Sequence, residues 1–431
     1  MLIIIKKIIK IIFSFILISC NSNSIDLIVF NAKIYTANYK FDTATSFAVN
    51  DGRFIDIGGS ELVSKYKSKS IVDAKGMYVF PGFIDSHTHV LNSFLYKNKA
   101  NPSSDEKVVA LKEAQSLLFK NGITTISEAG IDPHDIQLID SLQKINELSF
   151  RVYGMINYSP ENLDYFVEKG PFETEKLNVR SFKVYLNSFG PSNTKNIKQR
   201  SFSENEMKNI IYSKEKFQEI CFRIAKSGFQ MNTYAMNGLS NSELISSYRN
   251  ALNGISDPRW RIENSSKIQK LDFNSLNSKF IPSFQLGNVN NGAINNDKTI
   301  SIDETESTYI NKDIIDWTGR LILGSNYPNE YINPLITFSR SLSSKKINSL
   351  NSSDFQIKNS LSRSEALKGI TVWGAYSNFE ELKKGSISIG NFADFVILSK
   401  NIMEIDIKLI PSTQVIATVL GGELKYRINI L

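Results

Sequence analysis

Cysteine is almost absent from this chain of 431 residues, which contains only Cys20 and Cys221. Cys221 stands beside Phe222 and close to Ile224 in a helical pattern, where we expect it to pack in the core rather than to act as a reactive thiol. Cys20 ends an apolar segment near the N-terminus. No disulfide is expected from two cysteines placed in this way.

A concentrated block of charge of one sign is also missing. The formal net charge of +7 comes from 50 basic and 43 acidic residues, without a basic stripe or a basic patch interleaved with aromatic residues. The sequence therefore predicts no nucleic-acid partner. The surplus of positive charge reflects a general enrichment in lysine. With 42% hydrophobic and 22% charged residues, the chain suits one large domain with a smaller one, and no internal repeat is evident.

The apolar stretch at residues 11–18 is too short to span a bilayer. It follows three lysines and ends in Leu-Ile-Ser-Cys20 before polar residues, a pattern similar to the lipobox of bacterial lipoproteins. We therefore predict that residues 1–20 are a signal peptide and that Cys20 is acylated. The lipid would anchor the protein to a membrane of the bacterial cell envelope, on its periplasmic or surface side. An uncleaved anchor is the alternative, because residues 2–5 are apolar as well.

Histidine is scarce too, and two of the three histidines form the pattern His87-Thr88-His89. Strand side chains alternate between faces, so two histidines one residue apart at a strand end point the same way and can reach one cation. His-x-His after an apolar strand and a Gly turn is typical of a metal site. The third, His134, lies in an Asp-Pro-His turn, and we expect it to be an ordinary histidine near solvent. The alternative is that His134 acts as a substitute metal ligand.

The middle of the chain alternates strand patterns with helical patterns, which predicts an α/β fold. Eight strands are expected, at residues 79–84, 122–127, 151–158, 181–186, 230–234, 260–263, 280–284 and 320–323. Helical patterns lie at residues 105–120, 213–226, 242–252 and 363–376, among others. Eight strand–helix units make a (β/α)8 TIM barrel over residues 80–384, with its chemistry at the carboxyl ends of the strands. The Asn- and Gly-rich residues 286–303 are expected to form a long loop over that face.

Short strand patterns occupy both ends of the chain. They lie at residues 27–30, 32–35, 47–49, 54–57, 393–398, 415–419 and 423–426. Asn50-Asp51-Gly52 is a hairpin pattern between two of them. We therefore expect residues 26–79 and 385–431 to form one small β-sandwich domain.

Several motifs are specific enough to indicate a family. They are the segment Pro81-Gly82-Phe83-Ile84-Asp85-Ser86-His87-Thr88-His89, together with Gly122-Ile123-Thr124-Thr125, Arg259-Trp260-Arg261-Ile262-Glu263, Gly324-Ser325-Asn326-Tyr327-Pro328, Ser362-Arg363-Ser364-Glu365-Ala366-Leu367 and Ala393-Asp394-Phe395. With the eight units and the flanking β segments, they resemble the amidohydrolase superfamily. The branch that looks most similar is amidohydrolase family 3, which holds N-acyl amino-acid deacylases and related amidases. The resemblance covers roughly residues 26–428 and implies the barrel fold.

The resemblance also implies a site of six side chains for zinc or another divalent metal. The His-x-His pair falls on His87 and His89, and a fourth-strand lysine, often carbamylated to bridge two metals, falls on Lys183. Strand alternation puts Lys183 on one face with Ser181 and Tyr185, toward the barrel interior.

The other three family positions are substituted in this chain. The fifth-strand histidine corresponds to Tyr234 and the sixth-strand histidine to Asn264. The eighth-strand aspartate, which in the family binds metal and takes the proton from the attacking water, corresponds to Asn326.

These substitutions disfavour hydrolysis on chemical grounds. A neutral amide oxygen is a poor replacement for imidazole or carboxylate on zinc. Asn326 cannot accept a proton near neutral pH, so it cannot be the general base. Tyr234 could coordinate only as a phenolate, which requires a lowered pKa.

The sequence therefore leaves two main functions to be considered. By resemblance, the protein is a metal-dependent hydrolase that acts on carbon–nitrogen, non-peptide amide bonds of a small acylated substrate. The alternative is a catalytically inactive descendant that serves as a membrane-anchored binding or scaffold lipoprotein, which the chemistry of the substitutions favours. A third reading is a mononuclear enzyme that uses His87 and His89 with Glu128 or Glu263 as the base, although either glutamate can simply pair with a Lys or Arg.

Overall fold

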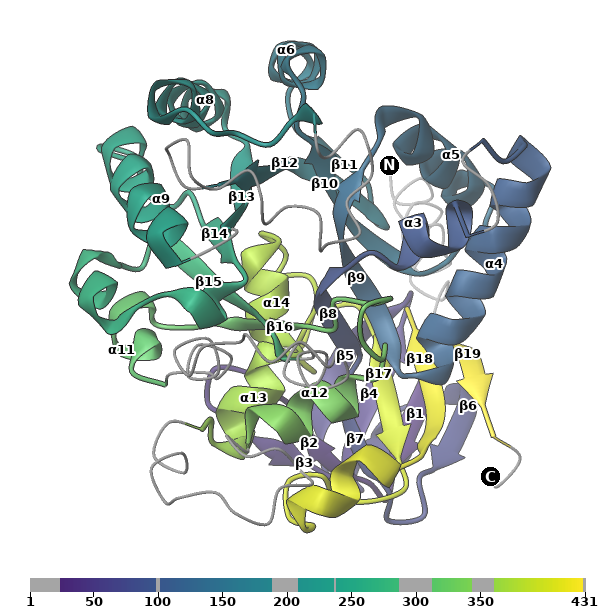
Figure 1. Cartoon of the computed structure of the whole chain (residues 1–431). Coiled ribbons are helices and arrows are strands. Elements are labelled where there is room, and N and C mark those ends of the chain that lie inside the picture. Colours follow the sequence, from purple (N-terminus) through teal and green to yellow (C-terminus); the bar gives the residue numbers. More distant parts are fainter. Residues whose placement is uncertain are drawn as a thin grey trace, which may run out of the picture.

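A computed structural model describes residues 24–97, 101–187, 208–235, 238–286, 312–342 and 360–428. The expected signal peptide with Cys20, and nearly all of the expected loop at 286–303, lie outside the described residues. Among the described residues, no helix combines the length and the apolar character needed to cross a membrane. The elements form a barrel of parallel strands and two smaller sheets, which confirms the predicted TIM barrel with a β domain built from both ends of the chain (Figure 1).

The eight barrel strands follow one another in chain order, and each is parallel to its neighbour. They are β8 (Phe83–Thr88), β9 (Ile123–Ile131), β10 (Arg151–Asn157), β12 (Leu177–Leu186), β13 (Gln230–Ala235), β14 (Trp260–Glu263), β15 (Phe280–Gln285) and β16 (Ile322–Gly324). A short strand, β11 (Phe172–Glu173), pairs antiparallel with β12. All eight predicted strands are present within a few residues of the expected positions.

The first predicted strand, residues 79–84, is divided between two sheets. Residues Tyr78–Pro81 form β7 in the β domain, and β8 begins at Phe83 in the barrel. Gly82 lies between them, and a Cβ atom there would come within 2.3 Å of Thr124 Oγ1. The chain can therefore pass this close to β9 only with a glycine, and the strand pattern alone could not show that the sheet changes at this point.

The barrel closes where β16 meets β8. The backbone N–H of Asn326 donates to the carbonyl of His87 (2.9 Å), and the N–H of Ser325 donates to Asp85 Oδ1 (2.9 Å). A Cβ atom on Gly324 would lie 2.5 Å from the His87 backbone nitrogen. Closure thus depends on the glycine and brings the end of the last strand directly against the His-x-His segment.

Helices surround the barrel, and its outward strand residues pack against them. The helices are α3 (Val90–Leu95), α4 (Ser104–Lys120), α5 (Pro133–Lys144), α6 (Pro160–Lys169), α8 (Lys214–Ser227), α9 (Gly238–Ala251), α11 (Ile314–Thr318), α12 (Pro334–Ser341), α13 (Arg363–Gly369) and α14 (Val372–Ser377), with short 3-10 helices η2 (Ser265–Lys267), η3 (Lys270–Ser275) and η7 (Ile407–Ser412). On β12, Phe182 and Val184 belong to this outer core. Cys221 of α8 is fully buried there, with its Sγ 3.7 Å from Met231 Sδ, which confirms its predicted role in packing.

The helix expected over residues 363–376 is divided into α13 and α14. The break falls at Thr371, whose backbone is not helical (φ −140°, ψ −103°). The carbonyl of Ile370 accepts the N–H of Ile84 from β8 (2.8 Å), so this part of the helix bonds to the barrel. The periodicity of the sequence spans both helices and does not reveal such a tertiary hydrogen bond.

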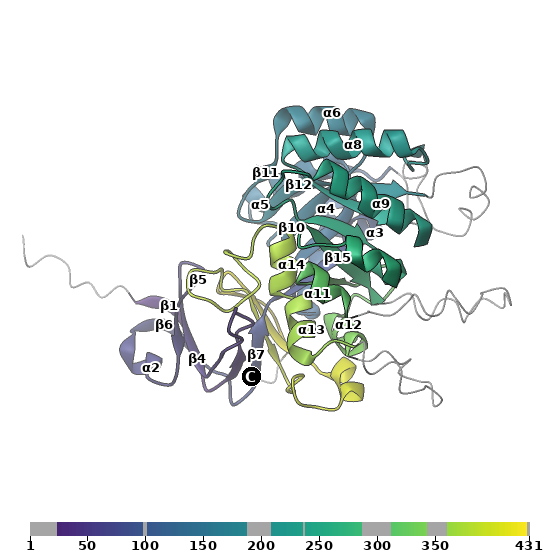
Figure 2. The same cartoon turned by 90° about the vertical axis from the view of Figure 1, so that its left-hand side faces the viewer.

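The β domain consists of two sheets. One has the order β5 (Arg53–Gly58), β4 (Ser46–Asn50), β1 (Ile25–Phe30), β6 (Ser68–Asp73), with the short helix α2 (Leu62–Lys65) beside it. The other has the order β19 (Glu423–Arg427), β18 (Val415–Leu420), β17 (Phe395–Leu398), β7, β2 (Lys33–Tyr35), β3 (Thr43–Ala44). Figure 2 shows these purple and yellow strands together, beside the barrel.

A buried cluster joins the two sheets, with Phe47 packed edge-on against both Phe54 and Phe395 at centroid distances of 5.0 and 4.9 Å. The expected hairpin is also present, since Asp51 and Gly52 between β4 and β5 both have positive φ (48° and 72°).

Candidate functional site

The parallel register decides which side chains share a level inside the barrel. Paired residues on neighbouring parallel strands project to the same face of the sheet. Two inward-facing rows run across β12, β13 and β14: Lys183, Asn232 and Arg261 form one, and Tyr185, Tyr234 and Glu263 form the next row toward the carboxyl ends. The second row is therefore nearer the barrel mouth, which is where the chemistry of this fold is located.

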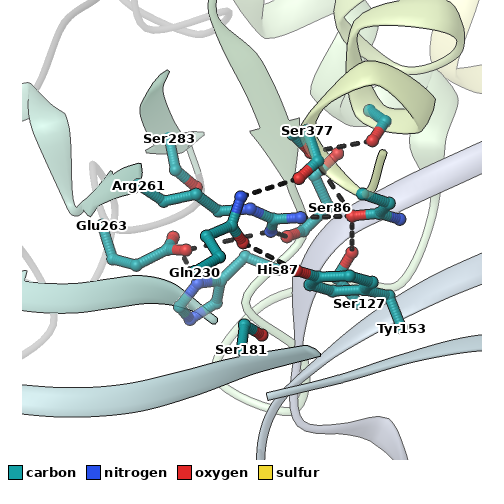
Figure 3. Close-up of polar contacts among 12 residues, drawn as sticks. Ser86, His87, Ser127, Tyr153, Ser181, Gln230, Arg261, Glu263, Ser283 and Ser377 are labelled. Atoms are coloured by element: carbon teal, nitrogen blue, oxygen red, sulfur yellow. Dashed lines mark hydrogen bonds and ion pairs between the residues drawn. The ribbon is translucent and has the colours of Figure 1, made fainter. Parts of the chain in front are cut away.

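Below these rows the barrel interior is polar. Figure 3 shows the Tyr153 hydroxyl donating to Gln230 Oε1 (2.8 Å), and Gln230 Nε2 donating to the carbonyl of Ser377 at the end of α14 (2.8 Å). Arg261, which belongs to the inner row itself, donates through Nη1 to the carbonyl of Ser86 (2.9 Å). Barrel interiors are usually filled with branched apolar residues, so this polar filling is a particular property of the chain.

His87 and Glu263 form the central pair of the site. His87 Nδ1 lies 2.7 Å from Glu263 Oε2, and both side chains are buried (Figure 3). Gln285 Nε2 donates to the same carboxylate oxygen (3.3 Å). With an ionised carboxylate as partner, His87 carries its proton on Nδ1, which leaves Nε2 as an acceptor.

The charges around this pair set its protonation state. Burial works against ionisation of Glu263, but His87, Lys183 and Arg261 outweigh it and lower its pKa to about 2. Burial, reinforced by the charge of Lys183, lowers the pKa of His87 to about 4 despite the carboxylate. A neutral imidazole that donates to a carboxylate is therefore the state of the pair at neutral pH.

His89 and Lys183 complete the cluster around the central pair. The rings of His87 and His89 lie 5.3 Å apart and almost perpendicular (80°). Burial, with further contributions from His87 and Lys183, puts the pKa of His89 well below its ordinary value. Lys183 is buried, and its Nζ lies 5.3 Å from the ring centroids of both Tyr185 and Tyr234. The structure thus brings His87, His89, Lys183 and Tyr234 together.

The two substituted asparagines lie next to this cluster. Asn326 (φ 57°) and Asn264 (φ 60°) both have the left-handed backbone, which asparagine tolerates better than most residues. Asn326 bonds to His87 through its backbone, and the N–H of Asn264 donates to Gln285 Oε1 (2.9 Å). Asn264 follows β14, which carries Glu263, and Asn326 follows β16, which lies against the His87 segment of β8.

The remaining candidates have other positions. The His134 side chain, at the start of α5, is 71% exposed and lies 3.5 Å from Asp135, so the structure places it outside the cluster. Glu128 on β9 accepts the backbone N–H groups of Leu91 and Asn92 at the start of α3 (both 3.1 Å). Burial raises the pKa of Glu128 to about 8, despite these two hydrogen bonds.

The donor set of the cluster does not fit a divalent metal. His87 and His89 are suitable ligands, but the third side chain is an amine whose positive charge repels a cation. The other three positions of the expected metal site are held by the phenol of Tyr234 and by the neutral amides of Asn264 and Asn326. Within the residues that the structure describes, no three His, Cys, Asp or Glu side chains are arranged to hold a metal ion.

Sequence reasoning did not single out Asn232 or Gln285, and it treated Arg261 only as part of a motif. Asn232 and Arg261 each stand two residues before a position of interest, Tyr234 and Glu263, so strand alternation could have placed them inside the barrel. The contacts of Gln285 depend on the turn after β14, which no sequence pattern indicates.

Comparisons with known proteins add to this picture. A sequence profile described as Amidohydrolase family matches residues 70–116 and 308–426. Protein LONG AFTER FAR-RED 3 of Arabidopsis thaliana is 25% identical over 342 residues, which cover 75% of this chain and 58% of that protein. Adenine deaminase 2 of Shouchella clausii is 27% identical over 124 residues, which cover 29% of this chain and 19% of that protein. The chain thus spans less than two thirds of the length of these curated relatives.

Solved structures with a similar fold cover most of the chain. An uncharacterized metal-dependent hydrolase from Pyrococcus furiosus matches with a TM-score of 0.68 and 15% identity, over 88% of this chain and 100% of that one. An adenosine deaminase from Xanthomonas campestris with bound zinc matches with a TM-score of 0.65 and 11% identity, over 95% of each chain. At these identities the likeness shows the fold.

Proposed function

Since the chain carries an amidohydrolase-family domain, we propose that it is a descendant of hydrolases that binds a small molecule at the barrel mouth without metal-dependent hydrolysis. The observation that carries this proposal is the donor set around Lys183. Its ammonium lies among two neutral imidazoles and Tyr234, and Asn326 stands where the family has its general base. These groups can hold a polar ligand by hydrogen bonds, but they offer no activated water.

One observation favours metal-dependent hydrolysis of a carbon–nitrogen bond in a small acylated substrate as the second candidate. His87 donates to Glu263, and a carboxylate behind a histidine is the usual arrangement that orients a metal ligand. Proteins with a similar fold include an adenosine deaminase with bound zinc, which also favours this second candidate. This candidate requires Lys183 to be carbamylated, because only the carbamate would be a negatively charged ligand. Zinc or another divalent metal would then act as a Lewis acid, and Glu263 would orient His87.

Hydrolysis assays separate the two candidates. With zinc supplied, the unmodified protein is expected to release no amino acid from N-acyl amino acids above the rate without protein. The triple variant Tyr234→His, Asn264→His, Asn326→Asp returns two ligands and the base and should bind zinc more tightly, although its turnover can stay low if substrate contacts are also absent. Robust turnover by the unmodified protein would show that the proposed function is wrong.

We further propose that lipid chains on Cys20 attach the protein to the bacterial cell envelope. Cys20→Ser should release the protein from the membrane fraction or leave it unprocessed, because serine cannot receive the thioether-linked lipid. The measurement is membrane fractionation with gel mobility, and Cys221→Ser serves as the matched control. A Cys20→Ser variant that fractionates and migrates like the parent would exclude acylation at this cysteine.

A further inference from the structure

We propose that the inward row of Lys183 and Asn232 binds the carboxylate group of a small organic acid. This inference rests on the proposed function and gives the chemical class of the ligand. It depends on two independent features, the amide of Asn232 and the charge distribution around Lys183.

Asn232 is the first feature. Its side chain is fully buried on β13, and neither its Oδ1 nor its Nδ2 has a hydrogen-bond partner among the described residues. A buried amide without partners is costly, and most native side chains of this kind are satisfied by protein, water or a ligand. In contrast, Gln230, the previous inward residue of β13, bonds to Tyr153 and Ser377. The unsatisfied amide is therefore at the level of Lys183 in the parallel register.

The sign of the charge is the second feature. In the parallel register, Asn232 is paired with Lys183 on one side and with Arg261 on the other. The next inward residue of β14 after Arg261 is Glu263, which is a carboxylate. That carboxylate accepts from His87 and Gln285, and its Oε1 lies 3.9 Å from Arg261 Nη1, so the two cations outnumber this one anion. Two aromatic rings, those of Tyr185 and Tyr234, stabilise the Lys183 cation within the barrel. The row presents a positive charge, which attracts an anion.

The spacing of the row suits a carboxylate. Neighbouring strands lie about 4.8 Å apart, so an ammonium and an amide N–H from paired positions can each reach one oxygen of the same carboxylate. A substituent of the acid next to the carboxylate, such as a hydroxyl, would face Asn232 Oδ1 and could donate to it. A divalent cation is disfavoured at the same place, because it would meet the ammonium of Lys183.

Thermal unfolding in sodium acetate, compared with sodium chloride of equal ionic strength, tests the inference on the full-length protein. Acetate should raise the midpoint of the parent by about 2–4 °C, since a ligand that binds only the folded state stabilises it. Lys183→Met and Asn232→Ala should each abolish this rise. Lys107→Met is the matched control, because Lys107 is a buried lysine that pairs with Asp135 (2.5 Å) outside the barrel, and this variant should keep the acetate response.

Two results would overturn the inference: a midpoint of the parent that acetate raises no more than chloride does, or an equal acetate-specific rise in the parent and in both Lys183→Met and Asn232→Ala. If Lys183→Met does not fold, Asn232→Ala still decides, because it removes no charge. Failure here is distinct from failure of the proposed function. Zinc-dependent amide hydrolysis would overturn the proposed function whatever acetate does, whereas absence of both hydrolysis and an acetate response would leave only this inference wrong.

Discussion

Replacing Asp394 with alanine is expected to lower the free energy of unfolding by about 3–5 kcal/mol, because it removes the buried partner of Arg151 and leaves this buried charge the exposed carboxylate of Glu175, 3.7 Å away. The Arg151 guanidinium binds Asp394 through Nε and Nη2, at 2.7 and 3.0 Å, and both side chains are almost completely buried. This pair connects β10 of the barrel to the start of β17 in the β domain. Asp394 also accepts the N–H of Gly421 (2.8 Å), so its loss affects the turn before β19 as well.

Urea unfolding of the variant and of a matched control measures this effect. Asp140→Ala is the control, since Asp140 pairs with the exposed Lys144 one helical turn away and should cost about 0.5 kcal/mol or less. The double variant Arg151→Met, Asp394→Leu should recover much of the stability, because no unpaired charge remains. A cost for Asp394→Ala as small as that of Asp140→Ala would contradict the role assigned to the pair.

Replacing Glu263 with glutamine should have a comparably large effect, and one that depends on pH. Glutamine keeps an acceptor for His87 Nδ1 but removes the negative charge beside Lys183 and Arg261, so we expect a loss of about 3 kcal/mol at pH 7. The matched control is Glu404→Gln, because Glu404 pairs with Lys33 at the surface. Its cost should be much smaller.

The pH dependence follows from the lowered pKa of Glu263. A carboxyl group whose folded pKa is about 2, against an ordinary 4.5, contributes stability that is present above pH 4.5 and is lost as pH falls through 2. The parent loses this contribution on acidification and the variant does not. The difference between their free energies of unfolding should therefore become smaller by about 2 kcal/mol from pH 7 to pH 3. A difference in the free energy of unfolding that stays constant or grows in acid would contradict the conclusion that Glu263 is ionised in the folded protein.

The comparison of variant with parent is needed because other buried groups titrate in the same range. His87, with its pKa lowered to about 4, loses its contribution as pH falls from 6.5 toward 4. Burial raises the pKa of Asp85 to about 6 and that of Glu128 to about 8, so these two carboxyl groups stabilise the protein in acid and lose that contribution as pH rises. Subtracting the two curves removes the contributions of Asp85 and Glu128. The His87 contribution differs between the curves, because Glu263 itself raises the pKa of His87.

The strands were predictable because most of the barrel strands are short segments that contain β-branched or aromatic residues and are bounded by turns. The inward position of Lys183 followed from strand alternation alone. The division of residues 79–84 between two sheets was not predictable, because it depends on the approach of Gly82 to Thr124 on another strand. The break at Thr371 has the same origin, since a tertiary hydrogen bond from Ile84 competes with the helix.

The candidate site was predictable only as a set of positions. The motifs identified His87, His89 and the substituted residues, but Glu263 entered as one possible base and not as the partner of His87. That pairing depends on closure of the barrel, which brings side chains of β8 and β14, strands that are far apart in sequence and not adjacent in the sheet, together in its interior. The row of Lys183, Asn232 and Arg261 likewise depends on the register of three parallel strands, which sequence alternation leaves open by two residues in either direction.

The most direct measurement of the central claim is the zinc content of the purified protein after exposure to zinc and bicarbonate, which would allow Lys183 to be carbamylated. If the cluster of His87, His89 and Lys183 is a polar binding site with a positive amine, elemental analysis should find far less than one zinc per chain. One or more tightly held zinc ions per chain, lost on Lys183→Met, would contradict this account and make the protein a metal-dependent hydrolase candidate again.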